Sequence, residues 1–302
     1  MSLRYIALAT LFTVSTYAHA DLAGDIAACN QAINQGDADK AMSLSEKILK
    51  QNKSNRDGLI CKGRAYSLMN QVPESLASLE KAKEVSQTPI DQMVALVLIG
   101  NVKKNAQQYV EAIESYEQGL TLARAENNKR FERINLNLIG ETLVDSGQLT
   151  SGLESYLAGS KLAANDNERG DNYARIADTY SRLGKHELAI EFQVKAMLMQ
   201  AHAGDTSDYA NAMLELGRIY TAANDYPNAE KYIQKVIKLS KEQGGAYWEA
   251  RSYYYLALAK IANKQTADVQ PLLADAQKIC DQIGAKELND QVSKVIDQLA
   301  VD

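Results

Sequence analysis

Histidines are the side chains best suited to metal binding or proton transfer at neutral pH, and this chain has three. Beyond the N-terminal segment they are His186 and His202, which we place in an inter-helix turn and between two helical units. Catalysis usually needs several titratable groups that converge on one point, and isolated histidines in turns do not supply them. The chain also lacks the patterns HExxH, GxSxG, GxGxxG and the phosphate-binding P-loop. We therefore expect no metal site, no cofactor and no enzymatic activity.

The charged residues also argue against nucleic-acid binding. Acidic residues such as Glu111, Glu114 and Glu117 recur at the spacing of a solvated helix face. The formal net charge is −5 and the basic residues are scattered, whereas phosphate backbones need a basic stripe. Sixteen tyrosines against three phenylalanines are compatible with base stacking. Most of these tyrosines occupy core positions of the repeat described below, so packing is the simpler interpretation.

The first twenty residues, MSLRYIALATLFTVSTYAHA, have the pattern of a cleaved export signal. Arg4 precedes an apolar run that is too short to span a bilayer, and the segment ends in Ala18-His19-Ala20. Two alternatives are a buried N-terminal helix and a lipid-modified Cys29, although acidic residues separate that cysteine from the apolar run. We expect cleavage after Ala20 and a soluble, periplasmic or secreted chain without membrane insertion.

One pattern of small and large residues recurs through the remainder of the chain. In the unit around Tyr180, a small residue lies three positions before the tyrosine, and further small residues follow at Ala189 and Ala196. The first small position recurs in steps of 34, 37, 40, 37, 40 and 40 residues, at Cys29, Gly63, Gly100, Gly140, Ala177, Gly217 and Ala257. Around Gly217 the apolar residues follow helical spacing up to a break at Asn224-Asp225, and a second helical pattern then begins. Each unit therefore reads as two helices, with small residues where the backbones cross and large ones where they diverge.

These units resemble the tetratricopeptide repeat. The stretches LIGNVKKNAQQYVEAIESYEQGL (98–120), IADTYSRLGKHELAIEFQVKA (176–196) and LGRIYTAANDYPNAEKYIQKV (216–236) match its pattern well. The first, second and last units match less well; Cys29 replaces the glycine in the first, and Lys260 replaces the tyrosine in the last. Steps longer than 34 residues imply longer helices or longer inter-repeat turns, such as HAGDTSDYA (202–210).

The resemblance implies an all-α protein, a right-handed superhelix (α-solenoid) of about seven helix-turn-helix units with a C-terminal capping helix. We expect a single solenoid domain over residues 21–302, with the capping helix over 285–300. The expected repeats are approximately 22–55, 56–92, 93–132, 133–169, 170–209, 210–249 and 250–284.

In this family the first helix of each pair lines a concave groove that usually carries the binding. The positions that the resemblance assigns to the groove are Arg64, Asn101, Glu141, Arg175, Asp178, Asn211 and Arg218. We place Tyr254 near the groove or its C-terminal mouth as a further partner contact, with cover by the capping helix as the alternative. Asparagine can hold an extended peptide backbone, and arginine can take a carboxylate in a fork. The carboxylate clamp of chaperone-type members is absent from the first three repeats, since Ile26, Cys61 and Leu98 occupy its polar positions. Any one of these residues can also be only the solvated inner face of a solenoid.

The sequence also leads to expectations about a disulfide bond and about the kind of partner. Cys29 and Cys61 lie at similar heights on neighbouring first helices, so we expect a disulfide between them and a free Cys280. The function that fits best is an exported, non-enzymatic scaffold that binds a peptide or protein in its groove. Two alternatives stay open: a structural subunit of an envelope assembly, and a sensory module partnered with a membrane signalling protein.

Overall fold

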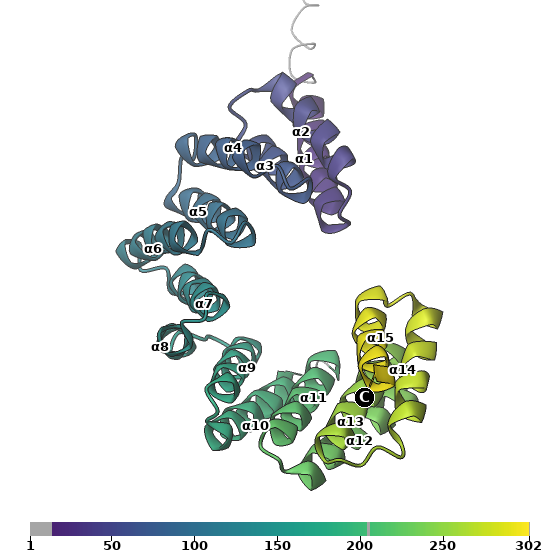
Figure 1. Ribbon diagram of the computed structural model, residues 1–302. Helices are drawn as coiled ribbons and strands as arrows, with labels where there is room; N and C mark the ends of the chain where they lie inside the picture. Colours follow the sequence, from purple (N-terminus) through teal and green to yellow (C-terminus); the bar gives the residue numbers. More distant parts are fainter. Residues whose placement is uncertain (1–13, 204–205, 302) are drawn as a thin grey trace, which may run out of the picture. The chain divides into compact units, whose positions relative to one another are not determined.

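The computed structural model describes residues 14–203 and 206–301, and within them every regular element is an α-helix (Figure 1). In chain order the helices are α1 (Val14–Asn34), α2 (Ala38–Gln51), α3 (Arg56–Leu68), α4 (Val72–Glu84), α5 (Pro89–Asn105), α6 (Tyr109–Ala125), α7 (Lys129–Asp145), α8 (Leu149–Ser160), α9 (Asp166–Arg182), α10 (His186–Ala203), α11 (Thr206–Ala222), α12 (Tyr226–Gln243), α13 (Ala246–Ala262), α14 (Val269–Ile283) and α15 (Lys286–Val301). The all-α prediction with paired helices is confirmed.

Two compact units make up the chain, residues 1–142 and residues 143–302. In each unit the odd-numbered helices are the first members of the predicted pairs and the even-numbered ones are the second members; we call them A helices and B helices. Within each unit the A helix packs against the following B helix, as α5 does against α6 and α9 against α10. A helices also contact the next A helix, as α1 contacts α3 and α11 contacts α13. The boundary between the units falls inside α7. The single domain expected over residues 21–302 stays a prediction.

The turn from each A helix to its B helix depends on one left-handed residue. These residues have φ values between 57° and 85° and are Gly36, Asn70, Gln107, Gly147, Gly184, Asn224 and Lys264. They recur in the same steps as the small residues of the sequence pattern, each seven positions later. Glycine adopts this conformation without strain and asparagine tolerates it, whereas Gln107 and Lys264 pay a steric cost. The spacing of the turns therefore sets the repeat register.

The predicted small positions lie where the helices of a pair meet. A Cβ atom added at Gly63 would come within 2.6 Å of Leu79 Cγ, and one at Gly217 within 2.6 Å of Ile233 Cγ1. At Gly100 the same atom would overlap the ring of Tyr116, which is fully buried. These contacts agree with the interpretation of the pattern as a packing code.

The A helices α5, α7, α9, α11 and α13 begin about one turn before the predicted repeat boundaries, whereas α3 begins at its boundary, Arg56. For example, α5 starts at Pro89 rather than 93, and α9 starts at Asp166 rather than 170. The Thr88 and Asn165 side chains accept hydrogen bonds from the backbone N–H groups of Asp91 and Glu168, which caps these extra turns. The stretch from 202 to 210 is also helical on both sides of residues 204–205. Longer helices, rather than longer turns, account for the steps near 40 residues.

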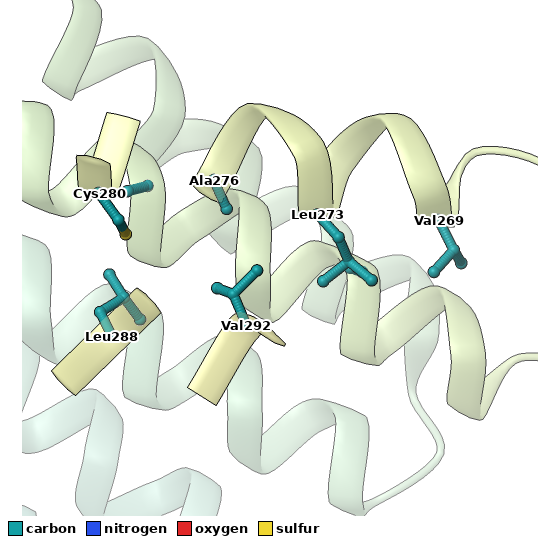
Figure 2. Close-up of a cluster of buried hydrophobic side chains, with 8 residues drawn as sticks. Val269, Leu273, Ala276, Cys280, Leu288 and Val292 are labelled. Carbon is teal, nitrogen blue, oxygen red and sulfur yellow. The ribbon is translucent and has the colours of Figure 1, made fainter. Parts of the chain in front are cut away.

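The C-terminal helix covers the last pair, as expected. Leu288 and Val292 of α15 point towards Leu273, Ala276 and Cys280 of α14, and all five are at most 4% exposed (Figure 2). The apolar positions of α15 therefore close the end of the core. Of the described residues, no helix has both the length and the apolar character needed to cross a membrane.

Candidate functional site

A hollow of about 330 Å³ lies on the A-helix face of the first unit. Its apolar lining consists of Ile33 from α1, Leu68 from α3, Leu79 from α4, and Leu98 and Val102 from α5. Its polar lining consists of Arg64 and Ser67 from α3 and Asn101 and Asn105 from α5. The structure thus brings two of the predicted groove residues, Arg64 and Asn101, to one concave site.

The Arg64 guanidinium has only neutral partners. Its two terminal nitrogens donate to Asn30 Oδ1 at 3.2 Å and Asn34 Oδ1 at 3.5 Å. Among residues 22–203 and 206–300, whose side chains the structure describes, no carboxylate forms an ion pair with it. Burial lowers the pKa of Arg64, and no neighbouring carboxylate raises it again. Arg64 therefore carries a positive charge that the unit itself does not neutralise.

Asn101 is oriented from behind by a buried phenol. The Tyr116 hydroxyl of α6 donates to Asn101 Oδ1 at 2.8 Å. The Tyr116 ring passes next to Gly100, where any side chain would block it. This bond fixes the orientation of the amide, whose Nδ2 group can donate to a ligand.

Glu141 of α7, the third predicted groove residue in the first unit, forms an ion pair with Lys104 of α5. Both side chains are partly buried, with 16% of Lys104 and 32% of Glu141 exposed. This pair lies 37 residues apart in the sequence, one repeat step. It joins two successive A helices, so Glu141 already has a structural role.

In the second unit, Arg218 of α11 is neutralised by two carboxylates. Its Nε donates to Glu215 Oε2 at 2.7 Å, and its Nη2 donates to Asp178 Oδ1 of α9 at 2.6 Å. Burial acts to lower the pKa of Arg218, but the carboxylates of Glu215 and Asp178 raise it overall. The predicted groove residues Arg218 and Asp178 therefore satisfy each other.

The same network continues to α13 through Arg251. Its guanidinium donates to Asn211 Oδ1 and to Glu215 Oε1, both at 2.7 Å, and to the Tyr255 hydroxyl at 2.9 Å. We call the six residues of this network the polar ladder: Asp178, Asn211, Glu215, Arg218, Arg251 and Tyr255. The pairing of Glu215 with Tyr255 could not be predicted, because their side chains meet only through repeat packing.

Arg175 and Tyr254 are the remaining predicted groove residues of the second unit. Arg175 of α9 is exposed and its guanidinium lies 5.9 Å from the ring centroid of Tyr156 on α8. Tyr254 packs against the core between α13, α14 and α15, and burial raises its pKa. The neighbouring Tyr255 joins the polar ladder, and the assignment of Tyr254 to the groove stays a prediction.

The cysteines occupy the positions that the repeat pattern gives them. Cys29 of α1 and Cys61 of α3 form a disulfide with a Cα–Cα distance of 6.3 Å. Asn30 follows Cys29 directly, and Arg64 lies one helical turn beyond Cys61, so the cross-link lies beside one wall of the hollow. Cys280 is buried and free in the C-terminal core.

Neither histidine takes part in a metal-like cluster. His186 opens α10, and the Nδ1 atom of His202 lies 3.0 Å from Asp166 Oδ2. Within the described part of the chain, no three histidine, cysteine or acidic side chains gather closely enough to hold a metal ion.

Comparison with known proteins identifies the repeat. Profiles of the tetratricopeptide repeat match residues 94–126, which cover most of α5 and all of α6, and residues 168–242, which cover most of α9 and nearly all of α10 to α12. The chain is a tetratricopeptide repeat protein. A search of curated protein sequences finds no match.

Solved structures of the same fold cover most of the chain. The APC/C hetero-tetramer Cut9–Hcn1 matches at 15% identity and a TM-score of 0.58 over 87% of this chain, which spans only 48% of the other. The Pyrococcus horikoshii STAND protein PH0952, with its tetratricopeptide repeat sensor, matches at 17% identity and a TM-score of 0.68 over 92% of this chain and 45% of that one. A Rap protein complexed with Competence and Sporulation Factor matches at 13% identity and a TM-score of 0.52 over 93% of this chain and 97% of that one. At such identities the likeness concerns the fold alone.

Proposed function

We propose that this tetratricopeptide repeat protein is a non-enzymatic scaffold that binds a protein or peptide partner on the A-helix face of its first unit. The single observation that carries the proposal is the hollow, which places an unneutralised Arg64 beside an apolar floor. Binding sites typically combine an apolar lining with a few polar groups that fix orientation. The Rap protein solved with Competence and Sporulation Factor supports the idea that this fold can present such a site.

The polar ladder of the second unit belongs to the scaffold in this proposal. Its charged groups are paired with one another across α9, α11 and α13, so a ligand would have to displace bonds that already exist. We infer that Asp178, Asn211 and Arg218 hold the second unit together and that partner recognition depends chiefly on the first unit.

Export is part of the proposal. The N-terminal pattern supports cleavage after Ala20, although residues 1–13 lie outside the described residues. A disulfide in the first unit is compatible with an oxidising compartment. The intact mass of the protein recovered from the envelope fraction tests this: a chain beginning at Asp21 is expected, and retention of residues 1–20 or a lipid on Cys29 contradicts it.

A pull-down with matched variants tests the binding face. Tagged wild-type protein, Arg64→Gln and a B-helix control, Glu114→Gln with Glu117→Gln, are each incubated with envelope extract, and the eluted proteins are compared by mass spectrometry. We expect at least one protein that is captured by wild type and by the control but lost with Arg64→Gln. Loss of the captured proteins only with the α6 control would favour an assembly subunit that uses its outer face.

A further inference from the structure

Arg64 differs from Glu141, Asp178 and Arg218, three other charged residues predicted to line the groove. Glu141 pairs with Lys104, and Arg218 pairs with Glu215 and Asp178. Arg64 contacts only the amide oxygens of Asn30 and Asn34, at distances near the long end of the hydrogen-bonding range. A half-buried guanidinium without a counter-charge gains more from an added carboxylate than a paired one does.

The polar groups of the hollow present hydrogen-bond donors. Arg64 can only donate, and the Nδ2 group of Asn101 is a second donor, beside an oxygen that already accepts one bond from the Tyr116 hydroxyl. Two donors on neighbouring A helices, both lining one concavity, match a ligand group that accepts hydrogen bonds and carries negative charge. A carboxylate meets both requirements.

The floor of the hollow matches a different part of the same ligand. Leu68 is 45% exposed although it lies among apolar neighbours, and Leu98 and Val102 continue the apolar surface along α5. An exposed leucine at the mouth of a concavity gains from contact with an aliphatic side chain. The volume of about 330 Å³ is sufficient for one such side chain together with a carboxylate.

We propose that the hollow binds the side-chain carboxylate of an aspartate or glutamate within an extended partner segment, together with an aliphatic side chain close to it. This inference rests on the proposed function and names the chemistry of its site. Leu68 and Asn105 are both exposed at the hollow, so a chain can cross it instead of ending in it. We therefore assign the carboxylate to a side chain and not to a chain terminus.

Selection from two random peptide libraries tests the inference with the full chain. In the first library each peptide is joined to a carrier protein at both ends, so only side chains supply carboxylates; in the second the peptide has a free C-terminus. Both are selected on wild type, Arg64→Gln, Leu68→Gln and Arg130→Gln, the last being an exposed arginine of the same unit outside the hollow. Helical melts confirm that each variant is folded.

We expect wild type to enrich Asp or Glu next to Leu, Ile or Val in the first library. Arg64→Gln should weaken binding of an enriched peptide by about tenfold or more, and Glu→Gln in the peptide should have the same effect. Both changes together should weaken binding little more than either change alone, because they remove the same contact. Leu68→Gln should weaken it severalfold, and Arg130→Gln should leave it unchanged.

Three results would overturn the inference. Enriched peptides that lack acidic residues, or whose binding ignores Arg64→Gln, would contradict the carboxylate site while leaving a peptide-binding scaffold intact. Enrichment only in the library with free C-termini would show that the site binds the terminal carboxylate and not a side-chain carboxylate. No enrichment in either library would remove the peptide site, and the pull-down would then decide the proposed function separately.

Discussion

Arg64 and Arg218 show how one residue type takes two roles at the same repeat position. Each directly follows the small residue of its unit, Gly63 or Gly217, so the sequence pattern assigned both to the groove. Packing places two carboxylates against Arg218 and two amides against Arg64. The identity of the neighbour depends on residues one repeat step away, and that is why the sequence predicted the position but not the partner.

This difference predicts that substitution of Arg218 lowers the stability of the fold more than substitution of Arg64 does. Arg218→Gln leaves Glu215 and Asp178 without the cation they share, and we expect it to lower the free energy of unfolding by about 1–2 kcal/mol, after allowance for the partial exposure of the pair. Arg64→Gln removes only two long bonds to amides and should stay within about 0.5 kcal/mol of wild type. Urea unfolding followed by circular dichroism measures both, and equal losses in the two variants would argue against the paired network.

At the scale of the helix, the turns explain the repeat register better than the helices do. A left-handed residue follows each small position by seven residues, in all seven A–B pairs. Four of these turns contain residues that favour a turn: Gly36, Gly147, Gly184 and the pair Asn224-Asp225. Gln107 and Lys264 are not residue types that indicate a turn. The helix starts were missed for a related reason: the extra first turns depend on caps, which the pattern of small residues does not contain.

The strained turns predict a stabilising change. Lys264→Gly and Gln107→Gly should each raise the free energy of unfolding by about 0.5–1 kcal/mol, because glycine adopts the left-handed conformation without a steric penalty. The matched change Gly184→Ala should lower it by a similar amount, since open space around Gly184 leaves only the backbone cost. Thermal melts of the three variants provide the comparison; a melting temperature that falls in Lys264→Gly would show that the turn does not have this conformation.

The cross-link between α1 and α3 predicts a thiol count and a stability change. The denatured oxidised protein should show one free thiol, Cys280, and the reduced protein three. Closing a loop with a sequence separation of 32 residues should contribute about 3–4 kcal/mol in the chain-entropy model, so reduction should lower the unfolding midpoint. Three free thiols before reduction would contradict the disulfide. If one free thiol is found but the unfolding midpoint does not change on reduction, the predicted contribution to stability is contradicted.

At the scale of the whole molecule, the repeat could be predicted from the sequence because each helix pair contains its own pattern of small and large residues. No Pro- or Ser-rich linker divides the chain, and the boundary between the two compact units indeed lies within α7. The pattern does not predict the roles that we propose for the two compact units, in which the first binds the partner and the polar ladder stabilises the second. Both present polar A-helix faces, and in the first a hollow accompanies Arg64, whose hydrogen-bond partners are two amides.

Site-specific photo-crosslinking in the producing cell tests this central claim most directly. A photoreactive amino acid is placed at Leu68, at the mouth of the hollow, or at Gln118, which is exposed on the outer face of α6. We predict that the Leu68 position yields a crosslinked partner and that adding Arg64→Gln abolishes the product, while the Gln118 position yields none. A partner that crosslinks only from Gln118, or a Leu68 product that persists with Arg64→Gln, would contradict the account.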